Sequence, residues 1–183
     1  MLQFQQGDVQ AFEQLYLKHK GPLYRYFVRQ IQDKQLAEDL YQDTWSKVIN
    51  AAARYSVTAK FTTWLYKIAH NLIIDHVRAV KPLDNTQALD EEQTMDSFSA
   101  DDSHQPEHQF EKDQQQQSMK DCIEKLPAVQ KEAFLLNIEL GLTAASISEI
   151  AGVTLEATKS RIRYAYKSIK ACVDARWQEV SHG

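Results

Sequence analysis

The amino-acid sequence predicts an all-α protein in which two small helical domains are joined by a flexible linker. Its 183 residues are 43% hydrophobic and 25% charged, a composition that supports a folded core. Five glycines and four prolines are too few for the many turns of a β-sandwich or barrel. Apolar residues recur at helical spacing on both sides of a polar middle stretch. We therefore expect domains at 1–81 and 118–183 and a linker at 82–117.

Four amphipathic helices are predicted in the first domain. Asp8 is a good N-cap for the first helix, which the Gly21–Pro22 pair should end, and Asp33 can cap the third. The helices are expected at residues 9–21, 22–32, 34–53 and 62–80.

Charge is segregated along the chain. Residues 1–81 carry eleven Lys/Arg and seven Asp/Glu, a net charge of +4, whereas residues 82–117 carry one against ten, a net charge of −9. Residues 118–183 carry nine against eight, a net charge of +1. The acidic, Gln-rich middle stretch cannot bury enough apolar surface to offset its ordering entropy, so it is predicted to be a linker. It either tethers the domains only, or mimics nucleic acid in a basic channel of a partner.

The second domain has the pattern of a helix-turn-helix. Its helices are expected at residues 118–126, 127–139, 144–151 and 155–178. Thr143 and Thr154 are suitable N-caps for the last two helices, and Gly152 turns the chain between them. A short helix, a glycine-containing turn and a long helix together are typical of this DNA-binding motif.

The last predicted helix carries a basic stripe beside an apolar face. At 100° per residue, Lys159, Arg163, Lys167 and Lys170 fall within about 80° of one another, and Arg161 flanks the other edge. Such a helix suits a DNA major groove, with its first residues at base edges and later ones at phosphates. The alternative is an ordinary solvated helix face.

Two segments of the first domain look unlike ordinary core filling. Residues 54–78 interleave aromatic with cationic side chains: Tyr55, Phe61, Trp64 and Tyr66 with Arg54, Lys60, Lys67 and Arg78. Exposed aromatic rings stack on unpaired bases with about 1–3 kcal/mol each while cations hold the phosphates, so this pattern predicts single-strand capture. Core packing is the alternative for Phe61 and Trp64. Residues 37–45 carry a polar set that is either solvated or a docking face for a partner.

Several functions are excluded by what the sequence lacks. The glycine spacing matches neither a dinucleotide-binding nor a phosphate-binding loop, and no hydrolase or metal motif occurs. We expect no cofactor, no metal and no catalytic activity. Cys122 and Cys172 are far apart in the sequence and are expected to be reduced thiols. Without an apolar span or signal peptide, the chain is predicted to be cytoplasmic.

Four motifs together resemble a known family. They are Gly7-Asp8-x-x-Ala11-Phe12-x-x-Leu15-Tyr16; Ala37-Glu38-Asp39-Leu40-Tyr41-Gln42-Asp43; Phe61-x-x-Trp64-Leu65-x-x-Ile68-Ala69-x-Asn71-x-x-x-Asp75-x-x-Arg78; and Leu126-Pro127 with Gly152-Val153-Thr154 and Lys159-Ser160-Arg161-Ile162. In order and spacing the chain resembles a bacterial extracytoplasmic-function (ECF) sigma factor of the sigma-70 family. The resemblance covers residues 8–81 and 118–175.

The resemblance implies that the chain is a dissociable specificity subunit of RNA polymerase, with sigma domains 2 and 4. It implies promoter DNA, the clamp helices and flap of core polymerase, and an anti-sigma factor as partners. The residues implied in polymerase docking are Glu38, Asp39, Tyr41, Gln42 and Asp43. Those implied at the minus-ten element are Arg54, Tyr55, Lys60, Phe61, Trp64, Lys67, His70, Asn71 and Arg78. Those implied at the minus-thirty-five element are Glu156, Ala157, Lys159, Ser160, Arg161, Arg163, Tyr164 and Lys167.

Two other hypotheses fit parts of the sequence. A two-domain regulator that binds DNA without polymerase would explain the helix-turn-helix, but it leaves the polar face of residues 37–45 without a purpose. An enzyme built on a helical bundle would use His70, Asp75 and His76. However, Asp75 and His76 diverge on a helix, and no motif supports a metal there.

Overall fold

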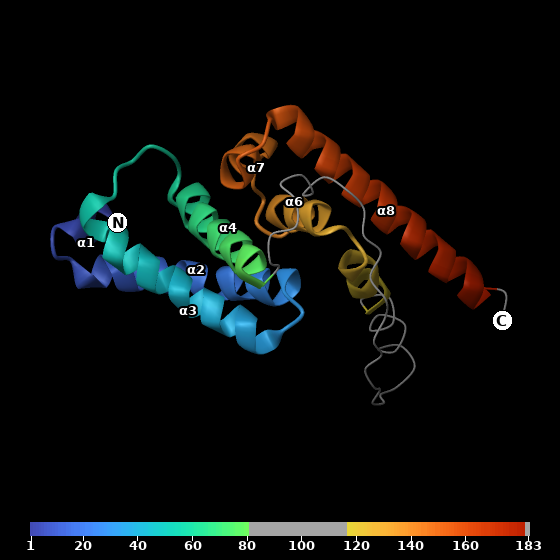
Figure 1. Cartoon of the computed structure of the whole chain (residues 1–183), viewed down its shortest axis with the longest axis horizontal. Helices are drawn as coiled ribbons and strands as arrows, with labels where there is room; N and C mark the ends of the chain where they lie inside the picture. Colours follow the sequence, from blue (N-terminus) through green and yellow to red (C-terminus); the bar gives the residue numbers. More distant parts are fainter. Residues whose placement is uncertain (81–116, 182–183) are drawn as a thin grey trace.

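The computed structural model describes residues 1–80 and 117–181, with side chains described as far as Trp177. Within these ranges every regular element is a helix, so the predicted all-α class is confirmed (Figure 1). The linker predicted at 82–117 lies outside the described residues except for Gln117.

The N-terminal domain is built around three long helices. It consists of α1 (Leu2–Gln5), α2 (Val9–Gln30), α3 (Lys34–Ala51), the 3-10 turn η1 (Ala52–Arg54) and α4 (Phe61–Val80). Helices α2, α3 and α4 pack on one another and enclose large apolar side chains. The most completely buried of the large side chains are Leu23, Tyr26, Phe27, Val48, Leu65 and Tyr66. The short helix α1 folds back against α2 and η1 and was not predicted.

The predicted break at Gly21–Pro22 is wrong, because α2 runs continuously through Pro22. A proline inside a helix lacks one backbone hydrogen bond and crowds the carbonyl group four residues earlier, but its further clash with the preceding Cβ is absent here because Gly21 has no Cβ. The helix also gains from continuing, because His19, Leu23, Tyr26 and Phe27 are all buried along one side of it.

The C-terminal domain consists of a helix at 117–124, α6 (Ala128–Ile138), α7 (Ala144–Ala151) and α8 (Leu155–Ser181). Gly152 adopts the left-handed conformation (φ +67°) between α7 and α8, so the predicted helix-turn-helix is confirmed. All four predicted caps are confirmed too. The side chains of Asp8, Asp33, Thr143 and Thr154 accept hydrogen bonds from backbone N–H groups in their helices' first turns. Each such cap contributes about 1 kcal/mol.

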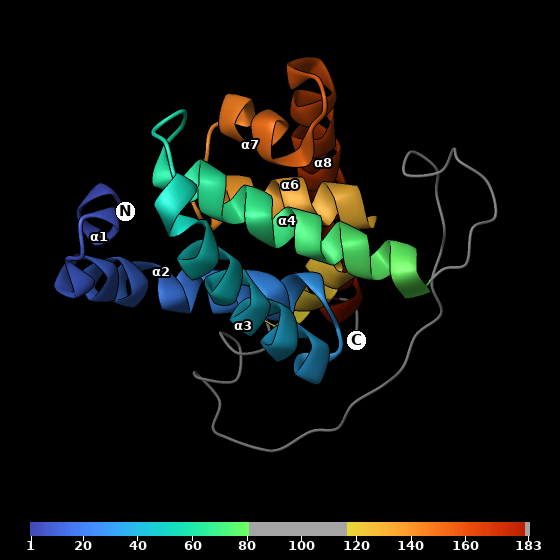
Figure 2. The same ribbon diagram turned by 60° about the vertical axis from the view of Figure 1, so that its left-hand side comes forward.

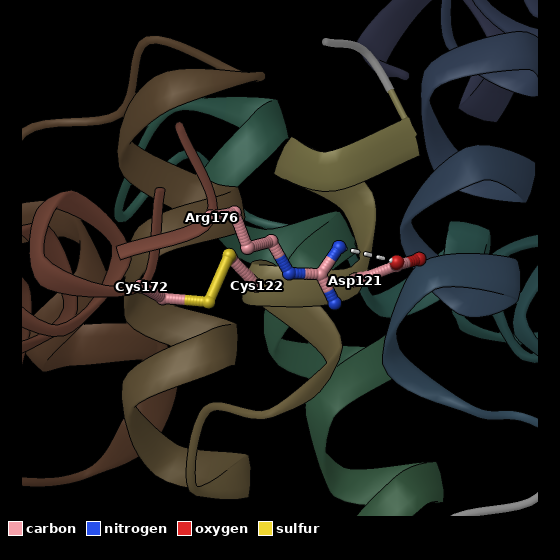
Figure 3. The surroundings of a disulfide bond; sticks show 4 residues. All are labelled: Asp121, Cys122, Cys172 and Arg176. Atoms are coloured by element: carbon pink, nitrogen blue, oxygen red, sulfur yellow. Dashed lines mark hydrogen bonds and ion pairs between the residues drawn. A yellow bond between two sulfur atoms is a disulfide. The ribbon is translucent and has the colours of Figure 1, made fainter. Parts of the chain in front are cut away.

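The prediction of reduced cysteines is wrong, because Cys122 and Cys172 form a disulfide (Figure 3). The two residues are 50 positions apart in the sequence, but the helix at 117–124 packs against the C-terminal half of α8, which brings their Cα atoms to 5.9 Å. One turn further along α8, Arg176 donates to Asp121 at 2.7 Å. The disulfide and this ion pair together fasten the start of the C-terminal domain to its last helix.

The two domains pack against each other. Helix α6 lies between α2 and α8, and α7 packs against α4 (Figures 1 and 2). A single cluster of buried residues therefore includes Leu65 and Ala69 of the N-terminal domain and Leu136, Ile147 and Ile150 of the C-terminal domain. No helix in the described part of the chain is long and apolar enough to cross a membrane.

Candidate nucleic-acid interface

An aromatic cluster lies where the loop after η1 enters α4. The rings of Tyr55 and Trp64 meet edge to face at 4.9 Å, and Phe61 lies 5.8 Å from Trp64. All three side chains are half-buried. Core packing and nucleic-acid stacking are therefore compatible here, because one side of each ring anchors the loop and another stays accessible.

A cavity of about 360 Å³ adjoins this cluster. One wall comes from the aromatic loop, with Tyr55, Val57 and Phe61, and the other from residues 1–3. Helix α1 is fixed in place by Gln5, whose Nε2 donates to the carbonyl oxygens of Ala52 at 2.5 Å and Tyr55 at 2.7 Å.

Polar and cationic side chains continue the surface along α4. Lys60, Lys67, Asn71 and Arg78 are exposed, and at 100° per residue they fall within about 40° of one another. Arg54 is exposed at the end of η1. The cations thus form a straight row that leads away from the aromatic cluster. Such a row is suited to contact the phosphates of a nucleic-acid strand.

The polar face of α3 is partly exposed as predicted. Asp39, Gln42 and Asp43 are exposed, whereas Glu38 and Tyr41 are half-buried. Tyr41 donates to the hydroxyl of Tyr16 at 3.3 Å, and burial, followed by this hydrogen bond, raises the pKa of Tyr41 to about 12. Tyr41 is therefore a neutral packing residue under the exposed acids.

The basic stripe of α8 faces solvent. Lys159, Arg163, Lys167 and Lys170 are exposed, and Glu156 forms an exposed ion pair with Lys159 at 2.8 Å. The other residues predicted to contact DNA divide by exposure: Tyr164 is 50% exposed, whereas Ala157, Ser160 and Arg161 are half-buried.

The apolar face beside this stripe is buried over a narrower width than predicted. Helical spacing predicts that this face contains Leu155, Thr158, Ile162, Ala165, Tyr166, Ile169 and Val173. Thr158, Ala165 and Ile169 are buried, but Leu155 and Tyr166 are 40% and 44% exposed. At 100° per residue these two side chains lie about 20° apart, at the same edge of the buried strip.

Comparison with known proteins agrees with this arrangement. The family model for sigma-70 region 2 matches residues 15–81, and the model for sigma-70 region 4 matches residues 116–169. The chain belongs to the ECF group of the sigma-70 family. The family predicted from the motifs is therefore confirmed.

Relatives cover almost the whole chain. The RNA polymerase sigma factor CarQ of Myxococcus xanthus is 26% identical over 93% of both chains. The ECF RNA polymerase sigma factor SigW of Bacillus subtilis is 29% identical, over 92% of this chain and 91% of its own.

Solved structures share the fold. CnrH, solved in complex with the cytosolic domain of CnrY, has a TM-score of 0.66 at 19% identity and covers 94% of both chains. The sigma factor RpoE, solved with the anti-sigma factor NepR from Bartonella quintana, also has a TM-score of 0.66 at 19% identity. It covers 91% of this chain and 98% of its own.

His70 differs from the other residues that the sigma-factor resemblance placed at the minus-ten element. Its side chain is only 12% exposed, and its Nδ1 lies 2.8 Å from the carboxylate of Glu132 in sigma domain 4. In this arrangement His70 contacts the other domain and is largely shielded from solvent. The alternative hypothesis of an enzyme that uses His70, Asp75 and His76 finds no support in the geometry either. Among the residues that the structure describes, no cluster of metal-binding side chains occurs.

Sequence reasoning missed two parts of this sigma factor that bear on its sites. The first is α1 with Gln5, which shapes the cavity beside the aromatic loop; four residues ahead of a strong cap gave no periodic signal. The second is Glu132, which follows Gln130 and Lys131 in the sequence and directly precedes the apolar residues Ala133–Leu136. An acid beside a lysine at the start of such a run is ordinarily solvated, so no signal in the sequence indicates that Glu132 is buried.

Proposed function

We infer that this protein is a sigma factor that binds core RNA polymerase, directs it to specific promoters and promotes DNA melting. The observation that carries the inference is the pairing of two DNA-binding surfaces in one sigma-70 chain: the aromatic and cationic row of α4, and the basic stripe of α8. Neither surface alone requires polymerase, but together they suit a promoter with two separated elements.

The α4 surface is proposed to bind the minus-ten element. Extruding a base from the duplex costs a few kcal/mol, which stacking at about 1–3 kcal/mol per base can repay. Tyr55, Phe61 and Trp64 are half-buried and therefore held in place before DNA arrives. The row from Lys60 to Arg78 would hold the phosphates of the strand, and exposed Asn71 lies within that row to reach a base edge.

The α8 surface is proposed to bind the minus-thirty-five element in the major groove. Gly152 and the Thr154 cap fix where α8 begins, so Glu156, Ala157 and Ser160 lie in its first turns, nearest the bases. Lys167 lies further along and would contact phosphate.

Partners follow from the family. The exposed acids of α3 are proposed to dock on the polymerase clamp helices, and domain 4 on the flap of the second-largest subunit. RpoE was solved with an anti-sigma factor, and we propose that an anti-sigma factor also restrains this protein. We propose that the protein acts by binding alone, without catalysis, and in the cytoplasm, where it meets polymerase.

Reconstituted transcription tests the proposal. Bacterial core polymerase is mixed with the purified chain and a promoter library, and the 5′ ends of the transcripts are mapped. We expect defined start sites that are absent with core polymerase alone. A chain that binds DNA but neither captures core polymerase nor selects start sites would support the rival hypothesis of a regulator that works without polymerase.

A further inference from the structure

The contact between the two domains contains a buried carboxylate. Glu132 of α6 is 8% exposed, and its Oε1 accepts a hydrogen bond from the Tyr26 hydroxyl of α2 at 2.6 Å. The same oxygen lies 2.8 Å from Nδ1 of His70 in α4. Both partners belong to the N-terminal domain, so Glu132 has these partners only while the domains are together.

Helix α6 presents different residues to its two neighbours. At 100° per residue, Glu132, Ala133 and Leu136 lie on one side, and Phe134 and Leu135 on the other. Ala133 and Leu136 belong to the core cluster shared with the N-terminal domain, whereas Phe134 and Leu135 belong to the cluster formed with α8. The α8 side therefore holds domain 4 together, while the Glu132 side serves the contact with domain 2.

At this contact between the domains, hydrogen-bond donors face acceptors and a cation faces an anion. Burial, and next the charge of Glu132, raises the pKa of Tyr26 well above its usual value, so the hydroxyl remains a donor. At the rim, Arg29 of α2 forms an ion pair with Glu139 and Gln30 donates to the carbonyl oxygen of Ala128 at 3.2 Å. Specific polar pairs of this kind fix how two apolar faces meet, because any other register leaves a buried charge without a partner.

We propose that the face formed by Tyr26, His70 and the neighbouring apolar residues of α2 and α4 is a docking surface for the chain's own domain 4 in the free protein, with Glu132 as its latch. The docked state covers His70 and must open before both DNA-binding surfaces reach their separate elements. This last step rests on the proposed function; the docking itself does not.

Charge reversal at the latch tests the proposal. Glu132→Lys places an ammonium group against His70 and leaves the Tyr26 hydroxyl without its acceptor. In the open state position 132 lies at the surface, where a lysine is harmless. Tyr26→Phe removes the donor from the other domain and keeps the ring. Glu149→Gln, at an exposed acid of α7, is the matched control.

Small-angle scattering of the full chain and titration with core polymerase are the two measurements. We expect the radius of gyration to rise for Glu132→Lys, and less for Tyr26→Phe, with circular dichroism unchanged. Because apparent affinity scales with the competent fraction, polymerase binding should tighten for Glu132→Lys by the same factor by which the open fraction rises. Glu149→Gln should match the wild type in both measurements.

An unchanged radius of gyration in Glu132→Lys, with native circular dichroism, would overturn the proposal. So would a wild-type chain that already scatters as two separated domains. If the wild type binds no polymerase, the proposed function fails instead, while the scattering comparison still decides whether the domains dock.

Discussion

Reduction of the Cys122–Cys172 disulfide should cost the C-terminal domain much of its stability. The bond closes a loop of 50 residues that contains α6, α7 and the first two-thirds of α8. In the chain-entropy model, the loop-closure entropy removed from the unfolded state corresponds to about 4 kcal/mol at 25 °C for a loop of this length. The nearby Asp121–Arg176 ion pair is about one-third exposed and adds less than about 1 kcal/mol.

Urea unfolding followed by circular dichroism at 222 nm measures this cost. With a slope of about 2 kcal/mol per molar urea, a loss of about 4 kcal/mol lowers the midpoint by about 2 M. The wild type is compared with and without a phosphine reductant. The Cys122→Ser/Cys172→Ser variant is the control. Its urea midpoint should equal that of the reduced wild type and should not change when the reductant is added.

Equal midpoints for oxidised and reduced wild type would refute the reasoning. They would mean that the reduced unfolded chain keeps residual contacts that already restrict this loop, or that the bond does not form in the protein as purified. Titration of free thiols before unfolding separates these two explanations.

Four further outcomes follow from the site. Asn71→Ala should weaken promoter opening, measured by permanganate reactivity of unpaired thymines, more than it weakens polymerase binding. Arg163→Ala with Lys167→Ala should weaken duplex binding at the upstream element and lower its salt slope by about 2, while polymerase affinity stays unchanged. Gln5→Ala should speed hydrogen exchange in the loop after η1 and impair opening; Gln6→Ala, an exposed neighbour, should do neither. Burial alone would raise the pKa of Asp121, but hydrogen bonds from Arg176 and Gln117 outweigh it and hold that pKa below its usual value. The stabilisation is therefore present above the unfolded pKa and lost as pH falls through the lower folded value, a loss that Asp121→Asn should remove from the acid unfolding curve.

Local chemistry made much of the fold predictable. A short polar side chain just before a run of apolar residues at helical spacing is favoured as an N-cap. Four helix starts were therefore predicted correctly, at Asp8, Asp33, Thr143 and Thr154. Gly152 likewise marked the turn of the helix-turn-helix. The stripe on α8 followed from helical angles, because solvent exposure there is decided within one helix.

Features that depend on distant partners were not predictable in the same way. Pro22 was expected to end a helix because its local cost was visible, while the burial that repays it comes from other helices. The disulfide depends on residues 117–124 meeting α8, and no rule of sequence spacing contains that contact.

Helix α6 shows how a sequence can hint at such a contact without specifying it. Six consecutive residues, 131–136, are buried, although they span more than one and a half turns and so point in every direction. One covering layer cannot bury all of them, and α8 covers only one side. A run of this kind therefore requires a second layer, and the acid within it requires that this layer supply hydrogen-bond donors. Tyr26 and His70 meet that requirement, but nothing local to α6 indicates that they stand 106 and 62 positions away. In the sequence only the four apolar residues 133–136 hint at a second covering layer, and only the three-dimensional arrangement reveals that this layer is the other half of the same chain.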